Sequence, residues 1–425
     1  HEQSVQYINE YIARARAAQA EFEKMTQEQV DLAVKTIGKV VYENAEYLAK
    51  LAVEETRMGN VEDKIAKNKQ KAGIVWNNLR GKKSRGILDT DEKTGITRVA
   101  KPVGVVAAIT PCTNPIVTPM SNAMFALKCG NAIIITAHHR AVACSGKTIE
   151  MINDELRKLG YPEHLIQILD QHSREHTRNL ISSADVVIAT GGAGMVTAAY
   201  SSGRPALGVG AGNTPVIIDD TADIKMAVSS IIHSKTFDNG MICASEQSVT
   251  VMESIYKEVR KEFEYRGCYF LKQGEIDKVR KTILVNGALN AKIVGQPAYK
   301  IAKLAGVEVP EATKILIGEV ESVDISEEFA HEKLSPVLAM YKAKTFDEAL
   351  AKAERLVADG GYGHTASLYV NVNETEKIMK HAERMKTCRI VINTPSSHGG
   401  IGDLYNFKLA PSLTLGCGSW GGNSV

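Results

Sequence analysis

The stretch "ADVVIATGGAGMVTAAY", residues 184–200, places a strand pattern, a glycine-rich turn and a helix pattern directly one after another. Residues 185–189 form a short apolar run, and a helix is predicted from 195 to 201. Between them, Gly191, Gly192 and Gly194 let the backbone turn tightly and approach a ligand closely. The first amides of the helix would point at whatever lies over the turn, which suits a phosphate or pyrophosphate. The spacing is not GxGxxG, so a plain strand-to-helix turn remains the alternative.

The same alternation of strand and helix continues on both sides of this stretch. The apolar runs predict strands at 103–109, 132–136, 166–169 and 215–218. Helix patterns separate them at 119–128, 146–159 and 177–182, and a second series runs from a helix at 224–234 to a strand at 390–393. Short apolar strands separated by helices at this spacing predict an α/β fold with parallel sheets.

Two N-terminal segments differ from this pattern. Apolar residues recur at helical spacing through residues 3–80, which predicts helices. Residues 86–99 alternate in polarity around a turn at Thr90–Thr94, which predicts a hairpin. At 425 residues the chain is too long for one hydrophobic core, so we expect two domains that meet at a crossover near 210–215.

Composition and charge exclude several classes of partner. The chain is 44% hydrophobic and 24% charged, as is usual for a globular enzyme, and its formal net charge is +2. Nothing in this balance predicts binding to nucleic acid or to a membrane surface. The longest apolar stretches, 103–109 and 132–137, are far too short to span a membrane. The chain begins with His1 instead of Met, which favours a segment of a longer protein.

The cysteines point to a reducing compartment. There are seven, an odd number, and no two are spaced as CxxC. We therefore expect no disulfide framework, no metal site and a cytoplasmic location.

One of these cysteines has a setting that differs from the others. Cys243 lies in "KTFDNGMICASEQSV", residues 235–249, after a turn predicted at Asp238–Gly240 and before small residues and a β-rich run. A cysteine that only packs usually lies inside an apolar run, whereas a nucleophile needs room around its sulfur. The other cysteines look like packing or surface positions, although Cys112 could line a pocket.

A second candidate group lies in "AITPCTNPIVTP", residues 108–119, which follows a predicted buried strand. Its three prolines make the loop rigid and would fix the direction of Asn114. A rigidly held amide NH₂ is a good donor to a developing oxyanion. A role for Asn114 in satisfying the backbone of the turn is the alternative.

Two further segments bear on ligand binding. "GVGAGNTPV", residues 208–216, is rich in glycine but precedes a predicted strand instead of following one, so we expect a loop packed against a ligand or the other domain. His138, His139 and Arg140 end the strand predicted at 132–137, where polar groups of a parallel sheet face the ligand crevice. Adjacent strand residues point to opposite faces, so the two histidines are not expected to share a metal ion. The alternative is that these three residues contact only solvent at the end of the strand and bind no ligand.

Six strings along the chain together resemble the aldehyde dehydrogenase superfamily. They are "TPCTNP", "GVGAGNTPVII", "TFDNGMICASEQSV", "FAHEKLSPVLAMY", "TPSSHGGIGDLYNF" and "PSLTLGCGSWGGNS". The chain is more narrowly similar to the coenzyme-A-acylating branch, as in the N-terminal half of bifunctional aldehyde-alcohol dehydrogenases. The resemblance covers nearly all 425 residues. It implies two doubly wound α/β domains with a small oligomerisation hairpin at about 86–99.

The resemblance also implies a role for each part of the chain. Residues 1–210 would form the nucleotide-binding domain, 211–400 the catalytic domain, and 401–425 would return to the nucleotide-binding and oligomerisation region. The segment "PSSHGGIGDLYNF" would lie near the active-site mouth. The hairpin would pair across subunits of a homodimer or a higher homo-oligomer.

The resemblance assigns the site residues as follows. Cys243 matches the nucleophile, and Asn114 matches the oxyanion-hole asparagine. Glu332 matches the glutamate that contacts the nicotinamide ribose, and His331 beside it would relay protons, with a structural hydrogen bond as the alternative. The remaining cofactor-binding positions are Thr110, Pro111, His138, Thr190, Gly191, Gly192 and Gly210. The cofactor would be NAD or NADP, and coenzyme A a co-substrate.

One position departs from the hydrolytic members of the superfamily. Those enzymes carry a glutamate in an "ELGGKSP"-like string, which activates water against the acyl-enzyme. Aligned on Thr214–Pro215, that glutamate falls at Val209, and valine cannot act as a base. A thiol attacks a thioester without a strong base near neutral pH. We therefore expect transfer of the acyl group from Cys243 to coenzyme A.

Several alternatives stay open. A hydrolytic dehydrogenase is disfavoured by Val209, and an inactive or scaffolding half is disfavoured by the presence of Cys243 and Asn114. The substrate is expected to be a small aldehyde, with acetaldehyde as the default of the family. His138, His139 or Arg140 could instead meet an anionic aldehyde such as sulfoacetaldehyde, or the adenosine half of the cofactor. No ribose-reading acid decides between NAD and NADP.

Overall fold

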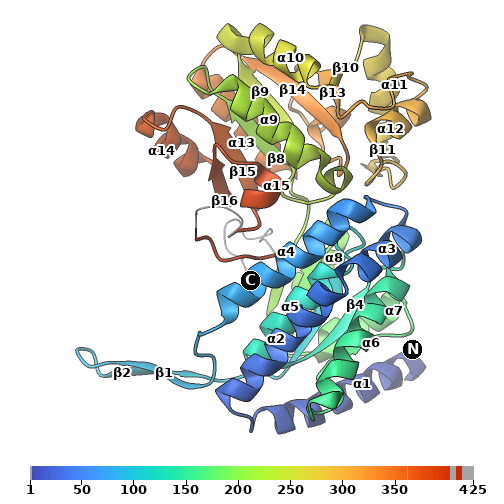
Figure 1. Ribbon diagram of the computed structural model, residues 1–425, viewed down its shortest axis with the longest axis vertical. Coiled ribbons are helices and arrows are strands. Elements are labelled where there is room, and N and C mark those ends of the chain that lie inside the picture. Colours follow the sequence, from blue (N-terminus) through green and yellow to red (C-terminus); the bar gives the residue numbers. More distant parts are fainter. Residues whose placement is uncertain (1, 361, 403–407, 414–425) are drawn as a thin grey trace.

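The computed structural model describes residues 2–360, 362–402 and 408–413, which form two α/β lobes with a long hairpin at one side (Figure 1). The N-terminal lobe begins with four helices, which confirms the helices predicted for residues 3–80. They are α1 (Glu2–Phe22), α2 (Gln27–Glu43), α3 (Ala45–Thr56) and α4 (Val61–Leu79). The start of α2 is fixed by a capping box, in which the side chains of Thr26 and Gln29 each accept a backbone N–H of the other.

A five-stranded parallel sheet forms the centre of the N-terminal lobe, in the order β5-β4-β3-β6-β7. The strands are β3 (Val105–Thr110), β4 (Ala132–Ala137), β5 (Ile166–Ile168), β6 (Val186–Thr190) and β7 (Ala206–Val209). The helices between them are α5 (Val117–Lys128), α6 (Val142–Lys158), α7 (Arg174–Ser183) and α8 (Ala193–Tyr200). All residues of β3 and β4 are buried, because helices cover both faces of the sheet.

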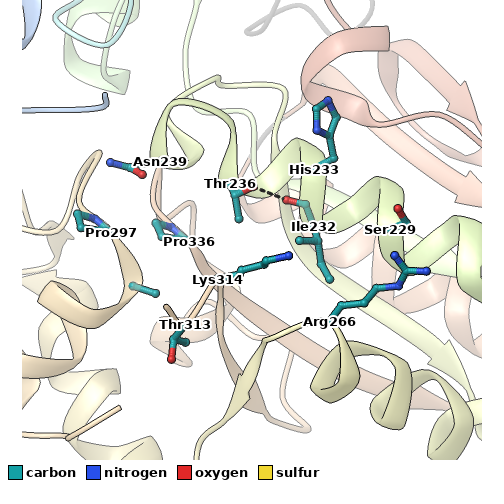
Figure 2. A pocket seen from close by; sticks show the side chains of 11 residues that line it. Ser229, Ile232, His233, Thr236, Asn239, Arg266, Pro297, Thr313, Lys314 and Pro336 are labelled. Carbon is teal, nitrogen blue, oxygen red and sulfur yellow. Dashed lines mark hydrogen bonds between the residues drawn. The ribbon is translucent and has the colours of Figure 1, made fainter. Parts of the chain in front are cut away.

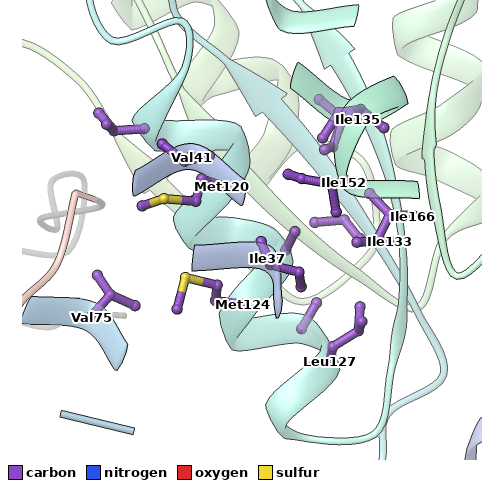
Figure 3. Close-up of a cluster of buried hydrophobic side chains, with 14 of the residues drawn as sticks. Ile37, Val41, Val75, Met120, Met124, Leu127, Ile133, Ile135, Ile152 and Ile166 are labelled. Atoms are coloured by element: carbon purple, nitrogen blue, oxygen red, sulfur yellow. The ribbon is translucent and has the colours of Figure 1, made fainter. Parts of the chain in front are cut away.

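The two faces of this sheet belong to different apolar clusters. Val106 and Ala108 pack with α2, α5 and α6, in the cluster that Figure 3 shows around Met120 and Met124. Their neighbours Val105 and Ala107 pack with α1 and α7 on the other face. Successive strand residues thus enter separate cores, which is the arrangement of a doubly wound α/β domain.

The second lobe contains a seven-stranded parallel sheet in the order β10-β13-β14-β9-β8-β15-β16. Its strands are β8 (Thr214–Ile218), β9 (Glu246–Met252), β10 (Tyr269–Phe270), β13 (Leu316–Glu319), β14 (Val337–Ala343), β15 (Gly363–Tyr369) and β16 (Thr387–Ile392). Its helices are α9 (Ile224–Thr236), α10 (Tyr256–Tyr265), α11 (Gln273–Ile283), α12 (Ala298–Ala305), α13 (Phe346–Gly360), α14 (Thr375–Arg384) and α15 (Ser396–Gly399). β11 (Leu284–Val285) and β12 (Ala288–Leu289) form a separate two-stranded antiparallel ribbon. The predicted α/β class with parallel sheets is therefore confirmed in both lobes.

A hairpin projects away from the N-terminal lobe (Figure 1). Its strands, β1 (Gly86–Asp91) and β2 (Ile96–Ala100), pair antiparallel around a turn that uses Gly95 in the left-handed region. Ile87 and Ile96 are each about 60% exposed, which is unusual for isoleucines in a strand. The predicted hairpin is confirmed, and its apolar side chains are left without cover.

Some predicted elements differ from the structure. Helices α5 and α6 begin earlier than predicted, at Val117 and Val142. The short edge strand β7 was missed, because a glycine at position 208 interrupts its apolar pattern. The glycine-rich stretch 208–216 therefore joins β7 to β8, so the statement that it does not follow a strand was wrong.

The last described residues return to the N-terminal lobe. Ile401 and Leu413 are buried in the same cluster as the residues of α2 and α5. Residues 403–407 and 414–425, which include Cys417, lie outside the described residues. The assignment of 401–425 to the nucleotide-binding and oligomerisation region therefore stays a prediction. Within the described part of the chain, no helix is long and apolar enough to cross a membrane.

Candidate active site

A cavity of about 1100 Å³ opens where the carboxyl ends of four strands of the first sheet meet. Thr110, Ala137, Thr190 and Val209 end β3, β4, β6 and β7, and each lines the cavity. Ligands bind at this edge of a parallel sheet because the strand-to-helix loops diverge there. Cys243 of the second lobe lines the same cavity, which therefore lies between the lobes.

A second cavity, of about 420 Å³, lies in the second lobe along α9 (Figure 2). His233 and Thr236 line it from α9, with Arg266 and Lys314 on the other side. None of the site residues predicted from the sequence lines this second cavity. The larger cavity is therefore the candidate active site.

The turn predicted before Cys243 is present, and its backbone is strained and tightly held. Asp238, Asn239 and Gly240 all adopt left-handed backbone conformations, with φ of 49°, 52° and 75°. The side chain of Asn239 donates a hydrogen bond to the carbonyl of Gly295 (3.0 Å). After the turn, the chain reaches Cys243 and enters β9 at Glu246. The nucleophile candidate thus sits in a short connection fixed at both ends.

The segment around α15 supports the other side of this connection. The hydroxyl of Ser396 donates a hydrogen bond to the carbonyl of Ala244 (2.7 Å), the residue after Cys243. His398 is buried nearby, stacked on His233 with ring centroids 4.9 Å apart. These contacts involve the described beginning of the segment that the resemblance put near the active-site mouth. Residues 403–407 of that segment lie outside the described residues.

The electrostatics of Cys243 favour a neutral thiol in the unliganded protein. Its side chain is partly exposed, and it reaches the cavity. Burial raises the pKa of the Cys243 thiol to about 12, and the negative charge of Glu332 acts in the same direction. Lys67 opposes this shift only in part. The thiol therefore needs a proton acceptor or a nearby positive charge to become a nucleophile.

Asn114 is fixed as the sequence predicted, but by more than its prolines. It is buried, lines the cavity, and stands at the entry to α5, where its carbonyl accepts the N–H of Thr118 (3.2 Å). Its side-chain Oδ1 accepts a hydrogen bond from Nζ of Lys67 (2.9 Å). Its Nδ2 has no hydrogen-bond partner among the described residues, so it is available to a ligand. An amide donor and a thiol thus share one cavity.

The loop between the lobes packs directly against Cys243. A Cβ at Gly212 would lie 1.9 Å from the carbonyl oxygen of Cys243, so only glycine fits at this position. The N–H of Gly212 donates to Oε2 of Glu332 (2.7 Å), which fixes that carboxylate at the cavity wall. Burial raises the pKa of Glu332. Gly210 also lines the cavity, as predicted for a loop that meets a ligand.

The residues present fit a dinucleotide on the N-terminal side of the cavity. Thr110 and Thr190 each bury a hydroxyl that has no hydrogen-bond partner among the described residues, and both line the cavity. Gly192 precedes α8 and has open space where a Cβ would stand. Together with Gly191 and Pro111, which also line the cavity, they leave room for a pyrophosphate over the start of α8.

The two histidines at the end of β4 do not point to opposite faces. The rings of His138 and His139 stack with centroids 4.2 Å apart, and both line the cavity. The expectation was wrong because β4 ends at Ala137 and the chain turns there, with the N–H of Ala141 bonded to the carbonyl of His138 (2.8 Å). Burial, aided by the charges of His139 and Arg140, lowers the pKa of His138 to about 4. His138 is therefore neutral at pH 7.

His331 is the one predicted site residue that lies apart from the others. It does not line the cavity, and its Nε2 is 2.6 Å from the carbonyl oxygen of Ile325. This contact is the structural hydrogen bond that the sequence left as the alternative to a proton relay. Cys112 does line the cavity, as the sequence allowed.

A cluster of buried charges near the site was missed from the sequence. Lys64, Lys67 and Lys71 are each at most 3% exposed and lie on one face of α4. Lys64 and Lys67 both bond to the carboxylate of Asp238. Positions 64, 67 and 71 lie on the same helical face as the buried residues Val75 and Leu79. This shared face was the feature of the sequence that could have predicted that the three lysines are buried.

Comparison with known proteins agrees with this geometry. A profile described as the aldehyde dehydrogenase family matches residues 1–281. A bifunctional aldehyde-alcohol dehydrogenase of Escherichia coli is 52% identical over 425 residues, which cover 99% of this chain and 48% of that protein. The chain therefore spans about half the length of this relative. A succinate-semialdehyde dehydrogenase (acetylating) of Clostridium kluyveri is 46% identical, with 98% of this chain and 92% of that protein covered.

Solved structures show the same fold. An acetylating aldehyde dehydrogenase from Geobacillus thermoglucosidasius superposes with a TM-score of 0.94 at 43% identity, covering 98% of this chain and 92% of that one. A propionaldehyde dehydrogenase of Rhodopseudomonas palustris, solved with bound coenzyme A and an acylated cysteine, gives a TM-score of 0.85 at 28% identity. It covers 96% of this chain and 92% of its own. The chain belongs to the aldehyde dehydrogenase family.

Proposed function

We propose that the chain is a coenzyme-A-acylating aldehyde dehydrogenase, which interconverts a small aldehyde plus coenzyme A and the acyl-CoA with NAD or NADP. The observation that carries the proposal is the shared cavity. It brings together a thiol, Cys243, and an amide donor, Asn114, with Val209 where a hydrolytic enzyme carries its base.

In the proposed reaction, the sulfur of Cys243 adds to the aldehyde carbonyl as a thiolate. Its raised pKa means that the thiol must first lose its proton, which passes to solvent, as the substrate and cofactor bind. Nδ2 of Asn114 donates to the oxyanion that forms. When bound, the nicotinamide supplies the hydride acceptor, and Thr110, Thr190 and Glu332 are the residues proposed to hold the dinucleotide.

The acyl group then remains on Cys243 as a thioester. Val209 is buried at the end of β7 and offers no proton acceptor. Glu332 is the one carboxylate among the described lining residues, and its Oε2 already accepts the N–H of Gly212. The position of the hydrolytic base therefore offers water no proton acceptor, whereas the thiol of coenzyme A ionises near neutral pH without one. The hydrolytic alternative would require Glu332 to leave Gly212 and reach the thioester.

The relatives support transfer to coenzyme A. The Rhodopseudomonas structure contains bound coenzyme A and an acylated cysteine, the two partners that the proposed second half-reaction needs. The Geobacillus and Clostridium proteins are described as acetylating. Because the chain spans about half of the Escherichia relative, an alcohol dehydrogenase activity is not proposed for it.

We propose acetaldehyde as the substrate, and an anionic aldehyde as the second candidate. The Geobacillus neighbour supports the first, and the succinate-semialdehyde relative supports the second. His138 and His139 lie at the end of β4, beside Thr110 at the end of β3, which favours the cofactor as their ligand. The neutral state of His138 also makes it a poor binding group for an anionic substrate such as sulfoacetaldehyde.

Variants at the two key residues test the proposal. Cys243→Ala should abolish NADH formation from acetaldehyde and coenzyme A, because it removes the nucleophile. Asn114→Ala should lower kcat by about 10²-fold, the usual cost of one oxyanion donor. Protein folding and NAD binding should survive both changes, as measured by circular dichroism and cofactor fluorescence. Substantial turnover by Cys243→Ala would transfer the role to another cysteine.

A further inference from the structure

We propose that Lys67 is a positioning residue for the oxyanion hole: its ammonium group holds Oδ1 of Asn114 and thereby aims Nδ2 into the cavity. The inference rests on the proposed role of Asn114 as the oxyanion donor. It adds a residue of the N-terminal helices to the machinery of the reaction, 47 positions before Asn114 and on a different element.

The contacts of Lys67 are short and fully buried. Its Nζ lies 2.9 Å from Oδ1 of Asn114 and 2.6 Å from Oδ2 of Asp238. Nζ of Lys64 lies 2.9 Å from the same Asp238 oxygen. The other oxygen of Asp238 accepts the N–H of Asn60 (3.1 Å). One carboxylate thus anchors two ammonium groups, and only one of these ammonium groups reaches Asn114.

The chemistry of the two side chains fixes the direction of the amide. An ammonium group has three donors and no acceptor, so only the oxygen of an amide can face it. The NH₂ end of Asn114 must then point the other way, and Asn114 lines the cavity that contains Cys243. Without Lys67, the two orientations of the amide would be closer in energy, and one of them presents an oxygen to the oxyanion.

The charges of the cluster keep this hydrogen bond strong. Burial raises the pKa of Asp238, but Lys64 and Lys67 outweigh burial and leave the pKa below its usual value. Burial lowers the pKa of Lys67 to about 8, although the charge of Asp238 acts to raise it. Lys67 therefore remains mostly protonated at neutral pH. A charged donor strengthens the bond to Oδ1 and polarises the amide, which makes Nδ2 a better donor.

A purely structural role explains Lys67 less well. Further along the same face of α4, Ala72, Val75 and Leu79 pack without charge. Well-packed apolar residues usually replace a buried ion pair without loss of stability. Lys64 alone would neutralise Asp238, since it makes its own ion pair with that carboxylate. Lys67 makes one contact that Lys64 does not make, the hydrogen bond to Asn114, and we take this contact as the reason for a second buried lysine.

A double-mutant cycle with Lys67→Met and Asn114→Ala tests the proposal. If Lys67 acts through Asn114, Lys67→Met should lower kcat by about 10-fold or more in the unmodified protein, with KM for the aldehyde changed less than kcat. In the Asn114→Ala background, the same change should have little further effect on kcat, within about threefold. Equal factors in both backgrounds would overturn the proposal and leave Lys67 a structural residue.

Lys64→Met is the matched control. It removes an equally buried lysine from the same carboxylate but touches no atom of Asn114. It should lower the melting temperature and show no coupling to Asn114 in the same cycle. Should Lys67→Met fail to fold, the cycle is run with Lys67→Gln, which removes the charge but keeps a polar side chain. Coupling of Lys64 equal to that of Lys67 would contradict the proposal.

The test also separates this inference from the proposed function. Wild-type turnover in Asn114→Ala would remove the oxyanion role of Asn114 itself. A large loss in Asn114→Ala together with additive behaviour of Lys67→Met would leave the proposed function standing and overturn the role of Lys67 alone.

Discussion

The reactivity of Cys243 is set by residues that surround it at close range. Glu332 places a negative charge near the sulfur, and the surrounding protein removes water from it. Both effects favour the protonated thiol. A thiol that ionises only when its partners are bound is protected from side reactions in the free protein.

The raised pKa predicts slow alkylation that accelerates with pH. Below the pKa of an acid, the ionised fraction rises with pH, so the rate of reaction of Cys243 with iodoacetamide should increase about tenfold per pH unit between about pH 7 and 10. Mass spectrometry of the labelled peptide measures this rate. Cys129 is exposed and should also react with iodoacetamide. The Cys243→Ser variant serves as the control, because it shows the labelling that comes from cysteines other than Cys243. A rate that levels off near pH 7 would show a thiolate already formed in the free protein.

At the same scale, the sequence predicted the two residues that we propose act on the substrate, but not the residue that we propose orients Asn114. Cys243 and Asn114 were predicted because a turn and three prolines mark them locally. Lys67 carries no local mark, since lysines on a helix usually face water. Its contact with Asn114 joins residues far apart in the chain, and only the packing of α4 against the loop after β3 creates it.

Among the elements, β7 and the loop after it are the ones that we propose decide the fate of the acyl group. The strand ends at Val209, and its carbonyl accepts the N–H of Gly191 at the start of the glycine turn (3.0 Å). This backbone hydrogen bond does not depend on the side chain at position 209, so a substitution there should leave the backbone in place.

Val209→Glu should therefore divert some acyl-enzyme to free acid. A carboxylate at the cavity wall can deprotonate water, provided that it reaches the thioester of Cys243. Free acid should then form without coenzyme A, and chromatography of the product measures it. Val209→Gln is the matched control, because it has the same shape but is not a base. Equal acid formation by the two variants would show that added polarity, and not base catalysis, admits water.

The elements themselves were predictable where their patterns are long. Helices in 3–80 and the strands at 103–109 and 132–136 were predicted because apolar residues repeat over whole elements. The four-residue strand β7 was not, since it contains a glycine and gains its stability from pairing with β6. The histidines after β4 were misplaced for a related reason: one residue decides whether a strand continues or turns.

At the scale of the whole molecule, the β1–β2 hairpin stands out because nothing in a single chain covers its apolar side chains among the described residues. Ile87, Ile96 and Val99 are at least half exposed on a ribbon that projects from the lobe (Figure 1). A two-stranded ribbon with apolar side chains is at most marginally stable alone in water. Pairing with another subunit would cover these residues.

We therefore predict that the protein forms at least a dimer through this hairpin. Light scattering at micromolar concentration should give twice the chain mass or more. Replacing Ile87, Ile96 and Val99 together with serine should shift the protein to monomer. Val372→Ser, which changes a valine elsewhere that is more exposed than Val99, should leave the mass unchanged. A monomeric unmodified protein would contradict the prediction.

The most direct test of the account follows NADH and products from acetaldehyde with and without coenzyme A. With Val209 in place of the base, the Cys243 thioester should resist water. NADH should form steadily with coenzyme A, and mass spectrometry should identify acetyl-CoA as the product. Without coenzyme A, NADH should stop at one equivalent per active site or less. Sustained NADH formation without coenzyme A, with free acid as the product, would contradict the acylating function.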